Sequence, residues 1–164
     1  MTMAALNGLD QESFIQALGW IFEDSPWVAE RAFQARPFQS LDALHHAMTE
    51  QVERAASAER MALLNAHPDL GARARLSQAS SAEQAGAGLD SLTPDELEQL
   101  LRSNAAYRHR FGFPFLLAVK GSTKYDILRA LQARIEASPE DEYREALRQV
   151  YRIARFRLED LIES

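Results

Sequence analysis

A histidine stands at a predicted end of helical structure, in the stretch His67-Pro68-Asp69-Leu70-Gly71. Proline disfavours helical backbone at the residue before it, so a helix that precedes this stretch is expected to stop at His67. Gly71 permits a turn that most other residues resist. An imidazole exchanges protons near neutral pH, because its unperturbed pKa is about 6.5. His67 is therefore a candidate acid or base at a rigid junction.

A second candidate stretch combines a hydroxyl, an acid and an amide in Ser80-Ser81-Ala82-Glu83-Gln84, followed by small residues to Leu89. The spacing of Ser80 and Glu83 is that of a helix capping box, and spacing alone favours this structural interpretation. A chemical role is compatible with it, because a helix start also offers free N–H groups to a carbonyl or carboxylate. Glu83 and Gln84 would add an acceptor and a neutral donor at the same place.

An apolar stretch from Phe111 to Val119 contains three phenylalanines around Gly112 and Pro114. Core packing is the plain explanation for the phenylalanines. A central strand tolerates proline poorly, so we interpret Phe113 to Val119 as a buried connection or a distorted helix start. Backbone amides in such a segment need partners, and a polar ligand is one way to provide them.

Arginines close the set of candidate groups, in Arg155-Phe156-Arg157-Leu158. Arginines on a terminal helix usually form a solvated face with weak ion pairs, and that alternative stays open for Arg157. His45 and His46 are adjacent, and no histidine pair has the i, i+4 spacing of a zinc helix, so no metal site is expected. The sequence contains no phosphate loop, dinucleotide fingerprint or nucleophile elbow.

Helix signals recur along the chain, whereas strand signals are nearly absent. The helix that follows Asp10 is expected to include Ile21 and Phe22, and the helix after Thr93 is expected to stop at Gly112. We predict an all-α bundle of about seven or eight helices in a single domain, residues 1–164. The expected helix starts are Asp10, Ser25-Pro26, Ser40, Ser57, Thr93-Pro94, Thr123 and Ser138-Pro139.

Composition is that of an ordinary globular protein, with 46% hydrophobic and 26% charged residues. A net charge of −6 argues against a nucleic-acid binder, which usually carries a dense basic patch. The absence of cysteine excludes disulfides, thiolate nucleophiles and cysteine-based zinc sites. The sequence has no signal-peptide pattern at its start and no apolar run of about 20 residues, so a cytoplasmic protein is expected.

Taken together, the stretches resemble the OHCU decarboxylase family, in which OHCU is 2-oxo-4-hydroxy-4-carboxy-5-ureidoimidazoline. Their order and spacing agree with the family over almost the whole chain. The resemblance implies an all-helical fold, often a homodimer, that converts this small molecule to (S)-allantoin and carbon dioxide without metal or organic cofactor. It rests on His67-Pro68-Asp69-Leu70-Gly71, Ser80-x-x-Glu83-Gln84, Asn104-x-x-Tyr107 leading into Phe111-Gly112-Phe113-Pro114-Phe115, and Ile153-x-x-x-Arg157-Leu158-x-x-Leu161.

The resemblance also implies which residues form the site. His67 would be the catalytic acid or base, and Glu83 and Arg157 would be its essential polar partners. The remaining implied substrate contacts are Pro68, the segment from Ser80 to Gln84, and the backbone of Phe115, Leu116, Leu117, Ala118 and Val119.

Two other functions are compatible with parts of the sequence. An interaction module without activity predicts an exposed apolar groove and leaves the placement of His67, Glu83 and Gln84 as coincidence. A ureide hydrolase would bind a similar ligand, but such chemistry usually needs a water activated by a metal or a nucleophile. Neither feature is visible in the sequence, so we predict the decarboxylase.

Overall fold

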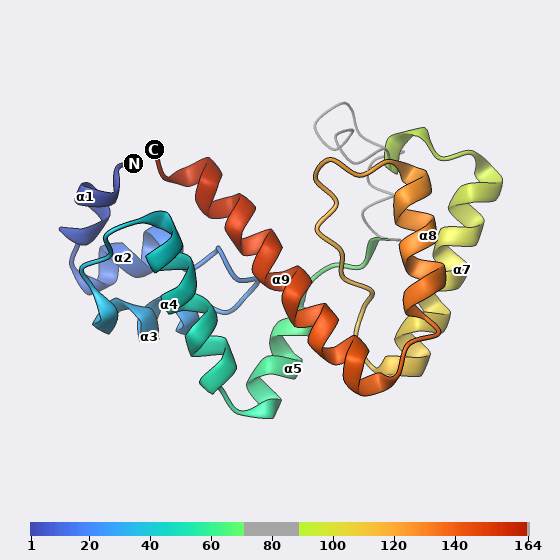
Figure 1. The fold of residues 1–164 in the computed structure, drawn as a ribbon, viewed down its shortest axis with the longest axis horizontal. Coiled ribbons are helices and arrows are strands. Elements are labelled where there is room, and N and C mark those ends of the chain that lie inside the picture. The colour runs from blue at the N-terminus through green and yellow to red at the C-terminus, as the bar shows by residue number, and fades with distance from the viewer. Residues whose placement is uncertain (71–88, 164) are drawn as a thin grey trace. The chain divides into compact units, whose positions relative to one another are not determined.

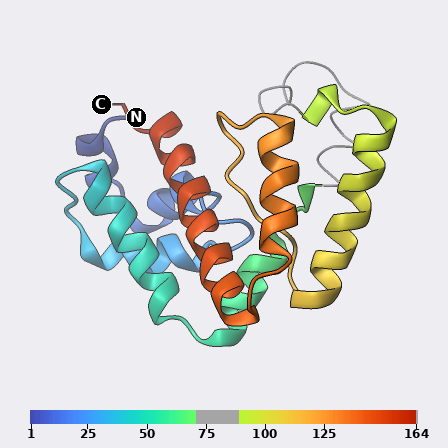
Figure 2. The same ribbon diagram turned by 45° about the vertical axis from the view of Figure 1, so that its right-hand side comes forward.

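The computed structural model describes residues 1–70 and 89–163 of the chain. Within these ranges the backbone forms eight α-helices and no β-strand, which confirms the predicted all-α fold (Figures 1 and 2). No helix in this part of the chain is both long enough and apolar enough to cross a bilayer. The helices are α1 (Met3–Asn7), α2 (Gln11–Leu18), α3 (Trp27–Ala32), α4 (Leu41–Arg54), α5 (Ser57–Ala66), α7 (Pro94–Phe111), α8 (Lys124–Arg134) and α9 (Pro139–Leu161).

Residue contacts fall into two compact units. The first, which we call the terminal unit, comprises Met1–Ala66 and Val150–Ser164, and the second, the central unit, comprises His67–Gln149. Helix α9 contributes residues to both. The chain therefore enters the central unit at His67, directly after α5, and leaves it within α9.

The core of the terminal unit is built on one face of α4. Leu44, Met48 and Val52 recur at helical spacing on this helix, and all three are fully buried. Phe14 of α2 packs edge-on against Phe33, with ring centroids 5.3 Å apart. The apolar helix faces predicted from the sequence thus form this core.

An aromatic cluster at the end of α7 forms part of the core of the central unit. The ring centroid of Tyr107 lies 4.6 Å from that of Phe111, 6.0 Å from that of Phe113 and 5.3 Å from that of Phe115. Each such pair contributes about 0.5–1.5 kcal/mol beyond the burial of its area. Phe113 and Phe115 are buried, which confirms the core-packing interpretation for both.

Local capping chemistry sets most helix starts where the sequence predicts them. In α7, Thr93 Oγ1 accepts from the N–H of Glu96 at 3.1 Å, and Glu96 Oε1 accepts from the N–H of Thr93 at 2.9 Å. Gly112 ends α7 with a φ of 80°, a left-handed conformation that glycine favours. The predicted starts are also confirmed at Asp10, Ser40, Thr123 and Ser138, whose side chains accept main-chain hydrogen bonds.

Helix α2 ends earlier than the apolar pattern predicts. It stops at Leu18 with Gly19 as its C-cap, so the prediction that Ile21 and Phe22 belong to the helix is wrong. Both side chains are nevertheless buried. The apolar pattern reports burial, and buried residues in a tight connection follow it as well as helical ones do.

Two predicted capping serines lie one residue away from the expected position. The N-cap of α3 is Pro26, and Ser25 Oγ donates to the carbonyl of Glu23 at 2.7 Å instead. Ser57 is the first residue of α5, whose first helical hydrogen bond runs from the N–H of Arg60 to the carbonyl of Ala56 at 3.1 Å. Helix α1 was missed because its five residues are too few to show a period.

Candidate active site

His67 lies where helix α5 ends. The last helical residue is Ala66, which confirms the predicted helix stop. Leu63 and Leu64 in the last turns of α5 are fully buried and fix the helix end. His67 is 6% exposed, whereas Pro68 beside it is exposed. The imidazole thus follows directly on an anchored helix end, as a positioned acid or base requires.

Part of the predicted site lies outside the described residues, namely Ser80, Glu83 and Gln84. The capping box and the substrate contacts expected for them stay predictions. Among the other predicted residues, His67, Pro68 and the segment 115–119 belong to the central unit, and Arg157 belongs to the terminal unit.

The segment 115–119 connects α7 to α8 without regular secondary structure. Phe115, Leu116, Ala118 and Val119 are buried, and Leu117 is partly exposed. Of the two interpretations from the sequence, the buried connection is confirmed and the distorted helix start is wrong.

Two side chains from neighbouring helices satisfy main-chain groups of this segment. Gln149 of α9 accepts a hydrogen bond from the N–H of Ala118 through Oε1 at 2.9 Å. Arg134 at the end of α8 donates from Nη1 to the carbonyl of Leu116 at 2.5 Å. Leu117 lies between them, and its N–H and C=O make no hydrogen bond within residues 1–70 and 89–163. These two groups are available to water or to a polar group of a ligand.

Arg157 is held by three acceptors near the end of α2. Nη1 donates to the carbonyls of Trp20 and Ile21, each at 3.1 Å. Nη2 donates to Glu23 Oε1 at 2.8 Å, and the Arg157 side chain is 27% exposed. Arg157 is therefore partly buried and held by three specific contacts, in contrast to a fully solvated arginine.

The guanidinium of Arg157 retains donors beyond these three bonds. An arginine carries five N–H donors in a fixed planar arrangement. Its Nε–H and second Nη2–H make no hydrogen bond to any residue that the structure describes. Arg157 can therefore bind an acceptor of a ligand without giving up its anchoring contacts.

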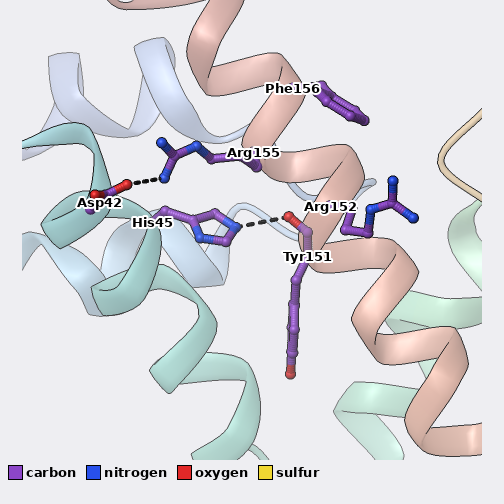
Figure 3. A pocket seen from close by; sticks show the side chains of 6 residues that line it. All are labelled: Asp42, His45, Tyr151, Arg152, Arg155 and Phe156. Atoms are coloured by element: carbon purple, nitrogen blue, oxygen red, sulfur yellow. Dashed lines mark hydrogen bonds and ion pairs between the residues drawn. The ribbon is translucent and has the colours of Figure 1, made fainter. Parts of the chain in front are cut away.

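The terminal unit also contains a pocket of about 360 Å³ that sequence reasoning missed (Figure 3). His45 Nε2 lies 2.8 Å from the carbonyl oxygen of Tyr151, and Arg155 forms an ion pair with Asp42. The sequence feature that could have predicted this pocket is the i, i+3 or i, i+4 spacing of polar residues on α4 and α9. The pocket is lined by Asp42, His45, Tyr151, Arg152, Arg155 and Phe156.

The charged groups of this pocket are already paired with protein. A ring nitrogen bonded to a carbonyl carries the proton, so Nε2 of His45 is a donor. Burial lowers the pKa of His45, which favours the neutral ring. Arg155 Nε donates to Glu159 Oε1 at 3.0 Å in addition to its pair with Asp42. We therefore assign these contacts to the packing of α4 against α9.

Acidic and histidine side chains do not gather as metal ligands in the described part of the chain. Within it, no group of three His, Cys, Asp or Glu residues lies close enough together to hold a metal ion. The described candidate groups are the imidazole of His67 and the main chain of 115–119 in the central unit, and the guanidinium of Arg157 in the terminal unit. Such groups suit proton transfer and the binding of a polar, planar ligand.

Sequence comparison relates the chain to known proteins along nearly its full length. A sequence model of the family described as OHCU decarboxylase matches residues 7–159. A Haloferax volcanii protein named 2-oxo-4-hydroxy-4-carboxy-5-ureidoimidazoline decarboxylase is 47% identical over 164 residues, which cover 100% of this chain and 98% of that protein. A Mus musculus protein of the same name is 36% identical over 166 residues, which cover 99% of this chain and 93% of that protein.

Solved structures show the same fold. A crystal structure of (S)-allantoin synthase matches with a TM-score of 0.85 and 34% sequence identity, over 100% of this chain. This chain spans 55% of that longer one. A crystal structure of OHCU decarboxylase in the presence of (S)-allantoin matches with a TM-score of 0.71 and 21% identity, over 95% of this chain and 100% of that one. At the lower identity the likeness concerns the fold alone.

Proposed function

We propose that this chain, which belongs to the OHCU decarboxylase family, converts OHCU to (S)-allantoin and carbon dioxide in urate degradation, a branch of purine catabolism. The observation that carries the proposal is the family match over residues 7–159, which spans every predicted site residue from His67 to Arg157. Identity of 47% to a protein named for this activity supports it along the full chain. The proposed ligand of the site is accordingly a small ureidoimidazoline.

The substrate supplies its own electron sink. When the bond between C4 and the carboxylate breaks, its electron pair forms a C4=C5 bond, and the C5=N electrons move onto that nitrogen, which takes a proton. Loss of the C4 hydroxyl proton and addition of a proton to one face of C5 then give allantoin with a defined stereocentre. These steps need positioned proton transfers and no external oxidant or reductant. We therefore propose a reaction without metal or organic cofactor.

We assign the proton transfers to His67. It takes the C4 hydroxyl proton, donates a proton to C5, or does both in turn. Its place directly after α5, and its burial, support the assignment, since a proton donor sets a stereocentre only when it is held on one side of the ring.

Glu83 is proposed to accept hydrogen bonds from the ureido N–H groups and to act as a polar partner of His67. The proposed binding residues around the ring are Pro68, Ser80, Gln84 and the main chain of 115–119. The N–H and C=O of Leu117 support the last of these, because they have no partner among the described residues.

We propose that Arg157 binds a ring carbonyl or the oxyanion that develops during the reaction. An arginine fixed on the departing carboxylate would stabilise the substrate more than the transition state and slow the step. Donors aimed at developing negative charge have the opposite effect. The two remaining N–H groups of the anchored guanidinium support this role.

We further propose that residues 1–164 act as one domain, within a homodimer located in the cytoplasm. Helix α9 contributes residues to both the terminal unit and the central unit, so neither unit contains the whole helix. This shared helix supports a single cooperative domain. One calorimetric unfolding transition would support the single domain, and two separate transitions would contradict it. Sedimentation equilibrium would distinguish a dimer from a monomer.

The activity is tested by circular dichroism on OHCU generated in situ from urate. The wild-type protein is expected to produce the (S)-allantoin signal much faster than OHCU decays spontaneously to racemic allantoin. Rates equal to spontaneous decay would contradict the proposal and favour an interaction module. Product that also shows cleavage of a ureido bond would favour a ureide hydrolase.

A further inference from the structure

We propose that Gln149 and Arg134 are positioning residues that hold the main chain of 116–118 in its substrate-binding geometry. The inference rests on the proposed function, in which the backbone of 115–119 contacts the substrate. It is carried by hydrogen bonds that lie entirely within the central unit. Neither side chain need touch the substrate, because each acts through the main chain.

The amide of Gln149 is fixed at both ends. Oε1 accepts from the N–H of Ala118 at 2.9 Å, and Nε2 donates to Glu145 Oε2 at 2.7 Å, one turn earlier on α9. Gln149 is also buried. The oxygen of an amide only accepts and its nitrogen only donates, so a flipped amide would lose both bonds. Glu145 thereby orients Gln149, and Gln149 orients the N–H of Ala118.

Arg134 ties the same segment to a buried carboxylate. Its Nη1 donates to the carbonyl of Leu116 at 2.5 Å, and its Nε donates to Glu142 Oε1 at 2.6 Å. The side chains of Arg134 and Glu142 are only 12% and 2% exposed. The hydroxyl of Tyr107 donates to the same carboxylate oxygen. The Leu116 carbonyl is therefore linked to α8 directly, and to α7 and α9 through Glu142.

These two anchors lie on either side of Leu117. With Leu116 and Ala118 fixed, the N–H and C=O of Leu117, which have no partner among the described residues, are fixed as well. A displacement of about 1 Å in a reacting group can cost roughly 100-fold in rate. Loss of either anchor is therefore expected to reduce substrate binding and turnover before it disrupts the fold.

The test exchanges the two ends of the Gln149–Glu145 contact. Gln149→Glu keeps an acceptor for Ala118 but sets two carboxylates against each other one turn apart, which is repulsive. We expect KM for OHCU to rise and kcat/KM to fall by roughly 10- to 100-fold. Adding Glu145→Gln restores a donor facing position 149, and kcat/KM is expected to recover most of the wild-type value.

Gln132→Glu is the matched control, because it makes the same exchange at an exposed position of α8. It is expected to leave KM and kcat unchanged. Gln149→Leu removes the acceptor altogether, and amide hydrogen exchange at Ala118 is expected to accelerate in this variant but not in the control. Melting temperatures of all variants report any general loss of stability.

Recovery in the double variant together with faster exchange at Ala118 in Gln149→Leu would support the positioning role. The role is overturned if the Gln149 variants lower the melting temperature but keep wild-type KM and kcat/KM in the folded enzyme. It is also overturned if Glu145→Gln fails to restore activity to Gln149→Glu. A wild-type protein that does not accelerate (S)-allantoin formation overturns the proposed function itself, so the two failures are distinct.

Discussion

Arg157 and Glu23 form an ion pair between α9 and the connection after α2, with Nη2 2.8 Å from Oε1. Because the same guanidinium also binds the carbonyls of Trp20 and Ile21, three acceptors fix its plane. A cation held in this way needs no reorganisation when negative charge develops on a substrate. The anchoring contacts of Arg157 and its proposed role in the reaction are therefore compatible.

Arg157→Lys is expected to lower kcat/KM by about 100-fold or more, a loss typical of removing a donor to a developing oxyanion. A lysine ammonium is a point charge and cannot bind three acceptors in one plane while presenting further donors to the substrate. Steady-state kinetics on OHCU measures the effect, with Arg129→Lys on the exposed face of α8 as the control. Wild-type kcat/KM in Arg157→Lys would show that Arg157 serves only the fold.

His45 is expected to make stability depend on pH below about 6.5. Burial lowers its pKa in the folded protein, and the neighbouring positive charge of Arg155 acts in the same direction. The hydrogen bond to Tyr151 and the charge of Asp42 oppose this without reversing it. Between the lowered pKa of folded His45 and a pH of about 6.5, position 45 therefore binds more protons in the unfolded chain than in the folded protein. The free energy of unfolding should fall as the pH falls through that range.

Urea unfolding at several pH values checks this expectation. The His45 contribution is fully present above the unfolded pKa and is lost as the pH falls through the folded pKa. His45→Gln should flatten this part of the pH dependence. His46→Gln, a change at the exposed neighbouring residue, should leave it intact. Equal slopes in wild type and His45→Gln would show that His45 does not cause this pH dependence.

Gly112→Ala is expected to destabilise the protein by about 1–2 kcal/mol, the cost of left-handed backbone in a residue with a Cβ. The added Cβ would meet no atom within 4 Å, so this cost is conformational and not steric. Thermal unfolding should show a melting temperature lower by several degrees. Gly8→Ala is the control, because Gly8 has a φ of −88° and room for a Cβ. An unchanged melting temperature in Gly112→Ala would contradict this prediction.

Helix starts were predictable where the capping chemistry is local. Thr93 and Glu96 stand three residues apart, and their mutual hydrogen bonds need only that spacing. The end of α2 was not predictable in this way. Ile21 and Phe22 follow the apolar pattern of the preceding residues, yet they are buried in the connection that also supplies main-chain acceptors to Arg157.

The buried connection at 115–119 was predictable from the sequence, but the side chains that anchor it were not. Pro114 within an apolar run predicted either a buried connection or a distorted helix start for Phe113 to Val119, and it said nothing of the partners of that main chain. Those partners are distant in sequence, since Gln149 lies 31 residues after Ala118 and Arg134 lies 18 residues after Leu116. The contacts that anchor Arg157 are equally non-local, because Trp20, Ile21 and Glu23 precede it in the sequence by 137, 136 and 134 positions. No short spacing in the sequence carries such information.

The role of His67 is tested by comparing wild type, His67→Ala and His46→Ala in the dichroism assay on freshly generated OHCU. We expect rapid appearance of (S)-allantoin with wild type and His46→Ala, and only slow racemic decay with His67→Ala. A His67→Ala protein that is folded and still forms (S)-allantoin at the wild-type rate would contradict the assignment of His67 as the proton-transfer residue.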